Sequence, residues 1–414
     1  MSNKRVAILH YASPPVVGGV EATIAFHARG LAARGYHVRV ISGRGGTFDP
    51  RVETVILPRL GSTHPDVLGV KRALDQGTVP PEFEPLVTQI VQELRPVLED
   101  CDAVITHNAH SLNKNLPFTA ALAKLTEDLS TRWIAWCHDL AWTNSQYQPE
   151  LREGYPYDLL RTVWNDTVYV TVSEARRPEL AELLRIDPGA VEVVVPGVDP
   201  AGFFHWTPVM QRLADRLGWM DADGLLLLPA RLTRRKNIAL ALRVLAEIRS
   251  QSGCDYRLIV TGPPGPHNPA NPGYLGELLD LRRDLELDSS VHFLYQYGES
   301  EDDPLIPDDA TMANLYLTCD ALFFPSTQEG FGIPVLEAGL AGIPAFCADI
   351  PPLRGTGGED AFYFDPVNGA PAEIAALVLR TLDNDPRFRL RNRVRQQFRW
   401  DAIIDHQIIP LIEG

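Results

Sequence analysis

Two glutamates eight residues apart, Glu329 and Glu337, are well placed to bind a hydroxyl-rich ligand. They flank a glycine-rich turn after an apolar run, and Pro334 between them suits the first position of a helix. We expect Glu329 in the loop and Glu337 in the first helical turn, where carboxylates can accept hydrogen bonds from sugar hydroxyls. A helix dipole alone also favours glutamates there, but it does not account for Phe331 and Gly332.

A cationic run stands out because the chain is otherwise strongly acidic, with a net charge of −15. Four of the six residues from Arg231 to Lys236 are Arg or Lys. A solvated surface is the plain interpretation of such a run. This one, however, begins where an apolar strand ends and opens a helix, so fixed charge and free backbone N–H groups would coincide there. We therefore expect it to bind a phosphate or diphosphate.

Histidine and amide side chains follow two further apolar runs. His138 could donate to or accept from a sugar hydroxyl, or simply cap its own loop. His107, Asn108 and His110 suggest a metal site, but no carboxylate or thiol is fixed nearby, so we expect no metal. We expect His107, Asn108 and Lys114 to contact a polar acceptor, with the lysine facing a carboxylate or phosphate.

A glycine pair, Gly18-Gly19, follows the first apolar run and opens a helix. Such a pair lets the backbone approach an anion at a helix N-terminus, although a tight turn explains it equally well. The dinucleotide pattern GxGxxG and the phosphate-loop pattern GxxxxGK[ST] are absent from this loop, which argues against NAD and P-loop ATP chemistry.

The elements that must position these residues are short apolar runs alternating with amphipathic stretches. Continuous apolar strands separated by helices are typical of parallel sheets covered on both faces. We predict an α/β protein of two Rossmann-like, doubly wound domains facing across a cleft. The expected strands are 6–12, 36–43, 52–58, 103–108, 133–139, 169–174 and 191–197, then 225–230, 256–262, 291–295, 321–326, 342–348 and 361–366.

The predicted domains are 1–200 and 201–394, joined by a proline- and aromatic-rich linker at 197–220, with the last segment, 395–414, packing back onto the first domain. A proline-rich loop at 262–274 is expected to be irregular, as a surface insertion or a lip of the cleft. In open parallel sheets, ligands bind outside the carboxyl ends of the strands, which is where the residues above fall.

Composition excludes several classes of protein. The chain has 414 residues, 45% of them apolar and 22% charged, which fits two or three folded domains. Its acidity disfavours nucleic-acid binding and attachment to an anionic membrane. Five scattered cysteines make no disulfide framework, and no signal peptide or membrane-spanning run is recognisable. We expect a cytoplasmic protein without stable membrane insertion; homo-oligomer formation stays open.

The segment EGFGIPVLE (329–337) resembles the EX7E motif of retaining glycosyltransferases with the GT-B fold, most closely glycosyltransferase family 4. Further segments fall in that family's order: GGVE (18–21), His138, VSE (172–174), PGVD (196–199), RLTRRKN (231–237) and FDP (364–366). The resemblance spans most of the chain and is most specific in its second half.

The resemblance implies the following donor contacts. Arg231 and Lys236 would hold the diphosphate of a nucleotide sugar. Glu329 and the backbone of Phe331 and Gly332 would bind the transferred hexose, and Glu337 the ribose.

The resemblance also implies that His138 reaches a far hydroxyl of the sugar and that Gly19, next to Gly18, lies beside the diphosphate or the acceptor. The loop near Tyr295 would meet the nucleobase, but the family often has glycine there, and also before the arginine, where this chain has Ala230. The base preference is therefore left open.

The function implied is transfer of a hexose from a nucleotide-diphosphate sugar to a small polar or glycan acceptor, with retention and by front-face attack. No cofactor is expected, and no metal, because cations and a helix dipole can neutralise the leaving diphosphate. Asp221-Ala-Asp223 resembles a metal-binding DxD motif but precedes a strand, so we interpret it as a turn. A nucleotide-sugar epimerase and a non-catalytic binding protein remain alternatives.

Overall fold

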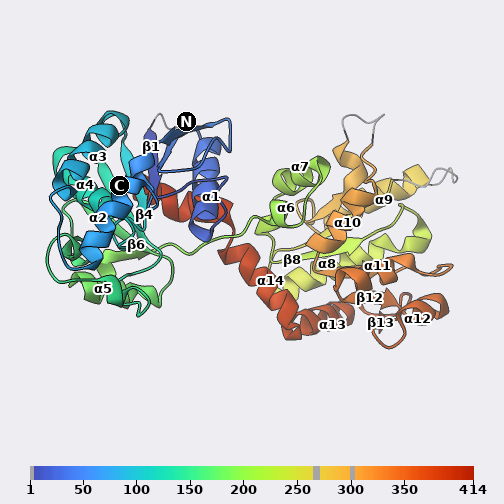
Figure 1. Cartoon of the computed structure of the whole chain (residues 1–414). Helices are drawn as coiled ribbons and strands as arrows, with labels where there is room; N and C mark the ends of the chain where they lie inside the picture. The colour runs from blue at the N-terminus through green and yellow to red at the C-terminus, as the bar shows by residue number, and fades with distance from the viewer. Residues whose placement is uncertain (1–3, 264–270, 299–303) are drawn as a thin grey trace. The chain divides into compact units, whose positions relative to one another are not determined.

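The computed structural model describes residues 4–263, 271–298 and 304–414, with backbone only at 271 and 272. The chain divides into two compact units (Figure 1). The first comprises Met1–Gly197 and Trp400–Gly414, and the second Val198–Arg399. Most of the proline-rich segment 262–274 lies outside the described residues.

The first unit is built on a seven-stranded sheet in the order β3-β2-β1-β4-β5-β6-β7, with every pairing parallel. The central strands are buried along almost their whole length, which is why they read as continuous apolar runs. The strands are β1 (Arg5–His10), β2 (His37–Ser42), β3 (Val52–Ile56), β4 (Ala103–His107), β5 (Arg132–Cys137), β6 (Thr167–Thr171) and β7 (Val191–Val193).

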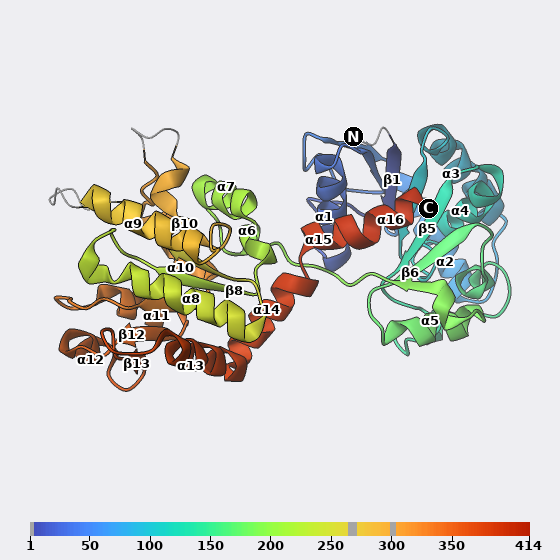
Figure 2. The ribbon, with the colours of Figure 1, turned by 180° about the vertical axis from the view of Figure 1, so that it is seen from behind.

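Helices cover both faces of this sheet. One apolar cluster joins the sheet to α2, α3 and α4, and another joins it to α1 and the C-terminal helices (Figure 2). A third packs α5 against β5 and β6. The helices are α1 (Gly19–Ala33), α2 (Pro65–Asp75), α3 (Phe83–Leu98), α4 (Leu116–Asp128), α5 (Arg176–Leu184), α15 (Trp400–Ile403) and α16 (Ile409–Glu413).

The C-terminal segment belongs to the first unit from Trp400 onward. Its indole stacks on Phe26 of α1, with ring centroids 5.4 Å apart. Arg34 at the end of α1 donates to Asp405 at 2.6 Å. The segment shares one apolar cluster with α1 and the sheet, so it completes the core on this side.

The second unit contains a six-stranded parallel sheet in the order β10-β9-β8-β11-β12-β13. All thirteen predicted strands are therefore present in the two sheets, and the predicted pair of Rossmann-like α/β folds is confirmed. The strands are β8 (Gly224–Leu228), β9 (Tyr256–Val260), β10 (Val291–Phe293), β11 (Ala321–Phe324), β12 (Ala345–Ala348) and β13 (Phe362–Phe364).

Helices also cover both faces of the second sheet. One apolar cluster includes α8, α9 and α13, and the other includes α7, α10 and α11. The helices are α6 (Pro200–Phe203), α7 (Pro208–Leu217), α8 (Ile238–Ser252), α9 (Asn271–Asp284), α10 (Asp309–Thr318), α11 (Ile333–Ala341), α12 (Pro351–Gly357), α13 (Pro371–Asn384) and α14 (Pro386–Gln397).

The expected linker at 197–220 is mostly folded, which corrects that prediction. Thr207 caps α7 by accepting a hydrogen bond from the Met210 amide at 3.1 Å, and Pro208 starts the helix. Gly218 ends it in the left-handed conformation, with φ +58°. Met210 is fully buried in the core of the second unit, so packing outweighs the proline-rich composition of this stretch.

Strand order reverses once in each sheet, between β1 and β4 and between β8 and β11. In doubly wound sheets the crevice at such a reversal is the usual ligand site. Within the described ranges, no helix has the length and apolar character needed to span a membrane.

Candidate functional site

Lys236 and Glu329 meet at the reversal point of the second sheet. Lys236 ends a 3₁₀ turn that follows β8, and Glu329 lies in the loop between β11 and α11. Lys236 Nζ and Glu329 Oε1 form an ion pair, with both side chains only about one-tenth exposed. Nζ also lies 4.8 Å from the ring centroid of Phe324. Burial lowers the pKa of Lys236, and the hydrogen bond to Glu329 opposes that shift.

Arg235 ties the two loops together beside this ion pair. Its Nη1 lies 3.6 Å from Glu329 Oε2 and donates to the Gln328 carbonyl at 3.0 Å. The Thr327 amide donates to the Arg235 carbonyl at 2.8 Å. Arg231, earlier in the same loop, is exposed, and its guanidinium has no hydrogen-bond or ion-pair partner among the described residues. The loops thus hold one charge pair in place and leave one cation available.

The glycine-rich turn before α11 has a demanding backbone at one position. Gly332 adopts φ +100°, and a Cβ there would meet Leu353 Cδ2 at 2.5 Å. The carbonyl of Phe331 accepts a hydrogen bond from the Thr356 hydroxyl. The ring of Phe331 is 58% exposed, and a Cβ at Gly330 would meet open space. The turn is therefore held in place by its contacts with α12, and its Phe331 ring and Gly330 are accessible to a ligand.

Glu337 lies in the second turn of α11, not in the first as expected, because the helix begins at Ile333 and Pro334 is its second residue. Glu337 is exposed, and its Oε2 accepts a hydrogen bond from the hydroxyl of Tyr316 at 2.6 Å. Burial, together with this carboxylate, raises the pKa of Tyr316. One carboxylate oxygen is thus held by α10, which orients the side chain.

Tyr295 lies in a 3₁₀ turn, Leu294–Tyr297, directly after β10. It is half-buried against the apolar core, and burial raises the pKa of its hydroxyl to about 12. β10 is an edge strand, separated from β8 by β9, so Tyr295 shares the carboxyl edge with Lys236 but lies away from the reversal point.

The reversal point of the first sheet carries three histidines. His10 ends β1, His107 ends β4 and His138 follows β5. His107 Nδ1 and His138 Nε2 are 2.9 Å apart, and His10 Nδ1 donates to the His107 carbonyl at 2.8 Å. Burial lowers the pKa of all three, that of His138 to about 4. His10 was not singled out from the sequence, although its place at a strand end was the available signal.

His107 and Asn108 are buried, so they are not accessible for the expected contact with an acceptor. His107 has no exposed surface, and Asn108 is 3% exposed. Asn108 adopts a left-handed conformation with φ 58°, and its Oδ1 accepts from the backbone amides of His138 and Asp139, at 2.8 and 3.2 Å. Both residues therefore support the loop of His138 from behind.

The remaining candidates of the first unit lie in loops. Gly19 is the first residue of α1 and Gly18 its N-cap, as predicted, and a Cβ at Gly19 would meet no atom within 4 Å. Lys114 is partly exposed, and its Nζ lies 4.7 Å from the ring centroid of Tyr147. Across the described residues, no group of three or more His, Cys, Asp or Glu side chains could hold a metal ion.

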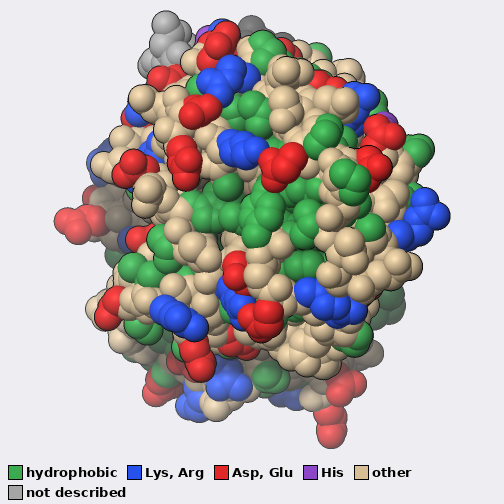
Figure 3. All heavy atoms as spheres, turned by 60° about the vertical axis from the view of Figure 1, so that its left-hand side comes forward, with side chains coloured by type: hydrophobic (Ala, Val, Ile, Leu, Met, Phe, Trp, Pro, Cys, Tyr) green, Lys and Arg blue, Asp and Glu red, His purple; other side chains and the backbone are tan. Residues whose placement is uncertain are grey.

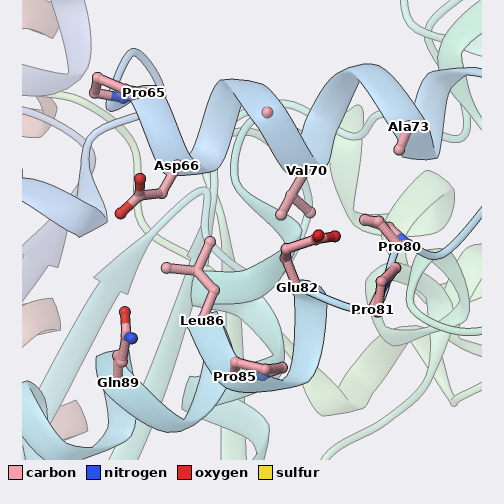
Figure 4. Close-up of a pocket in the computed structure, with 11 residues that line it drawn as sticks. Pro65, Asp66, Val70, Ala73, Pro80, Pro81, Glu82, Pro85, Leu86 and Gln89 are labelled. Carbon is pink, nitrogen blue, oxygen red and sulfur yellow. The ribbon is translucent and has the colours of Figure 1, made fainter.

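A separate pocket of about 790 Å³ lies between α2 and α3 (Figure 4). Proline side chains and two carboxylates, of Asp66 and Glu82, line it, and none of the predicted site residues does. Figure 3, which brings the first unit forward, shows apolar side chains gathered on one face among scattered charges. The pocket between α2 and α3 is distinct from the strand ends that carry the candidate site.

Two family models match the chain, one in each half. The model described as Glycosyltransferase Family 4 matches residues 17–201, and the model described as Glycosyl transferases group 1 matches residues 209–399. The second match contains both strands of the reversal between β8 and β11, whereas the first begins after β1.

Similar curated proteins carry one recurring name. A D-inositol 3-phosphate glycosyltransferase of Kineococcus radiotolerans is 32% identical over 252 residues, covering 56% of this chain and about half (54%) of that protein. One of Stackebrandtia nassauensis is 26% identical over 364 residues, covering 84% of this chain and 76% of that protein. Among solved structures, sucrose-phosphate synthase from Thermosynechococcus elongatus is 17% identical, with 99% and 98% of the chains covered and a TM-score of 0.39.

Proposed function

Because the chain belongs to the GT-B glycosyltransferases of family 4, we propose that it transfers a hexose from a nucleotide-diphosphate sugar to a hydroxyl of a small polar or glycan acceptor. The observation that carries this proposal is the Lys236–Glu329 ion pair at the reversal point of the second sheet, with Arg231 exposed in the same loop. Anion-binding and hydroxyl-binding groups there share one site.

Donor binding would exchange partners within this ion pair. The diphosphate carries two or more negative charges, so it competes with Glu329 for Lys236, and Arg231 adds a second charge-assisted contact. Once Lys236 turns to the phosphate, the carboxylate of Glu329 is free to accept hydrogen bonds from the hexose. Glu329 and the Phe331–Gly332 backbone would then hold the sugar, and Glu337, oriented by Tyr316, would hold the ribose.

We propose that transfer proceeds with retention at the anomeric carbon. The bond from that carbon to the leaving phosphate oxygen breaks, and the acceptor oxygen bonds on the same face. The departing phosphate takes the proton of the acceptor hydroxyl. Lys236 and Arg231 stabilise the negative charge that develops on the phosphate, which is the task that a metal ion performs elsewhere. No metal or other cofactor is required in this scheme, and activity in the presence of a chelator tests it.

The first unit would supply the other contacts. His138 lies at the strand ends where a sugar hydroxyl could reach it, and Gly18 and Gly19 give a backbone approach at the start of α1. Lys114, which is partly exposed, would suit an acceptor carrying a carboxylate or phosphate. D-inositol 3-phosphate, named in the relatives, has both polyol hydroxyls and a phosphate and belongs in the acceptor panel.

The test is a panel of UDP-, GDP- and ADP-hexoses screened by thermal shift, followed by incubation with candidate acceptors. An α-linked donor is expected to give an α-linked product by NMR, and a β product would contradict retention. Conversion of the donor without any acceptor would instead indicate a nucleotide-sugar epimerase. Binding of a donor without turnover of any kind would indicate a non-catalytic protein.

A further inference from the structure

His107 is a fully buried histidine that the proposed reaction does not use directly. Its Nδ1 lies 2.9 Å from Nε2 of His138, and the two rings are nearly parallel, with an interplanar angle of 27°. An imidazole nitrogen without a proton is an acceptor and one with a proton is a donor. A hydrogen bond between these two nitrogens therefore requires one proton, carried by one ring or the other.

The surroundings hold His107 in one orientation. Its ring stacks on Trp136 at 5.6 Å between centroids and contacts His27 at 5.4 Å. His10 fixes the backbone by donating to the His107 carbonyl. With no exposed surface, the ring has no room to turn away from His138.

The far side of the His107 ring decides where the proton lies. Its Nε2 is buried and has no hydrogen-bond partner among the described residues. If His138 donated, His107 would carry its own proton on Nε2, where a buried N–H would have no acceptor. If His107 donates from Nδ1, the group left unpaired is an acceptor. Unpaired buried N–H groups are the rarer of the two in proteins.

We propose that His107 is a positioning residue, which donates its Nδ1 proton to Nε2 of His138 and so leaves Nδ1–H as the ring group that His138 offers to a sugar hydroxyl. This inference rests on the proposed function, in which His138 contacts the sugar. His138 then acts as a fixed donor with one ring orientation.

Charge supports the neutral form of both rings. Burial and the neighbouring histidines hold the pKa of His107 well below its usual range, and burial together with His10 lowers that of His138 to about 4. The rings packed against the pair are those of His10, His27 and Trp136. Glu21 raises the pKa of His10, but no carboxylate is among the causes that set the pKa of His107 or of His138. At neutral pH the single shared proton is therefore the relevant one.

The test combines ¹⁵N-histidine NMR with kinetics on the full-length protein. In the wild type at pH 7, the His138 resonances, assigned by their loss in His138→Gln, should show a proton on Nδ1 and none on Nε2. His107→Phe keeps an aromatic ring but has no donor, so it should give a mixture of His138 tautomers. It should also lower kcat by roughly 10- to 100-fold, by analogy with the loss of a group that orients a metal-ligating histidine. His107→Asn, whose amide N–H can replace the Nδ1 donor, should recover most of both effects.

His110→Phe is the matched control. His110 is also buried, and its Nδ1 lies 2.8 Å from the Thr106 hydroxyl, but it makes no contact with His138. This change should alter stability without altering the His138 spectrum or kcat. A wild-type His138 protonated on Nε2, or a His107→Phe protein with unchanged spectrum and kcat, would overturn the inference. If no donor is turned over at all, the proposed function fails, whereas the wild-type spectrum still decides the role of His107.

Discussion

Lys236 and Glu329 are 93 residues apart in the sequence and form one nearly buried ion pair at the adjacent carboxyl ends of β8 and β11. Each would be costly to bury alone, because an unpaired charge loses its hydration without compensation. The pair thus lets each side chain compensate the charge of the other in a largely buried position.

Removal of either proposed diphosphate cation should slow transfer. Lys236→Ala or Arg231→Ala is expected to lower kcat/KM for the donor by about 10²- to 10³-fold, as for other groups that stabilise a developing anion. Arg234→Ala is the control, because this exposed arginine of the same turn pairs with Glu277 at 2.6 Å. Initial rates at subsaturating donor measure the effect. If Lys236→Ala and Arg231→Ala were as fast as the control Arg234→Ala, the assignment of these two cations to the diphosphate would be refuted.

Glutamine at the two glutamates should separate sugar binding from nucleotide binding. Glu329→Gln is expected to reduce turnover strongly but to preserve or tighten binding of a nucleoside diphosphate, because Lys236 loses its competing carboxylate. Glu337→Gln should weaken nucleotide binding more than turnover. Calorimetry with the nucleotide and steady-state kinetics with the full donor distinguish the two patterns. If Glu329→Gln instead weakened nucleotide binding and Glu337→Gln reduced turnover, Glu337 would bind the hexose and Glu329 the ribose.

Tyr316→Phe should affect nucleotide binding through Glu337 alone. The change removes one hydroxyl that donates to Glu337 Oε2 and leaves a buried ring of the same shape. A hydrogen bond to a charged group is worth about 1.5–3 kcal/mol, so its loss should lower nucleotide affinity by at most about 10- to 150-fold. Tyr155→Phe removes a hydroxyl that donates to Glu84 in the first unit instead, at 2.8 Å, and should leave affinity unchanged. Unchanged affinity in Tyr316→Phe would show that Glu337 needs no such support.

Two glycines of one turn should respond differently to alanine. Gly332→Ala must place a Cβ 2.5 Å from the buried Leu353 and hold a positive φ, so we expect a loss of about 1–3 kcal/mol of folding stability and reduced turnover. Gly330→Ala meets open space and should be nearly neutral for stability. Thermal or urea denaturation of both variants measures the difference. Similar stabilities would indicate that the turn can shift.

Stability should fall in acid because of the buried histidines. Burial lowers the pKa of His27 and of His110 to about 3, whereas the unfolded chain takes up these protons near pH 6.5. The contribution of these two neutral histidines to the free energy of unfolding is therefore fully present above about pH 6.5. It is lost as the pH falls toward 3. Each histidine should account for roughly 2 kcal/mol of loss by pH 5.

Urea denaturation of His27→Phe at several pH values checks this expectation. The variant should show a shallower loss of stability between pH 6.5 and 5 than the wild type. The same change at the exposed His37 is the control and should leave the slope unaltered. A wild-type stability independent of pH over this range would contradict the prediction.

The strands could be predicted because parallel strands buried on both faces are apolar at every position, as in the run that became β8. Glu329 and Lys236 could be singled out because each follows such a run. Their ion pair could not be predicted, since no local pattern reports a partner 93 residues away. Tyr316 was missed for the same reason: it lies within an apolar helix and becomes relevant only through Glu337.

The error at 197–220 had a different cause. Proline and aromatic residues were taken as signs of irregular structure, although Thr207-Pro208 is a helix start signal and Gly218 a stop signal. His107 was assigned to the acceptor because its position at a strand end was visible, whereas its depth was not. Depth depends on Trp136 and His27, which come from other elements.

The second unit is one continuous stretch of chain, whereas the first is made of two pieces, and this has a consequence during synthesis. Trp400–Gly414 leaves the ribosome on the order of 200 residues after Gly197, which at about 5–20 residues per second is a delay of roughly 10–40 seconds. Throughout that interval Phe26 and His27 lack the indole of Trp400 that later covers them. The nascent first unit therefore keeps an open apolar face while the second can fold completely, and a segment translated after the second unit closes the unit that was begun first.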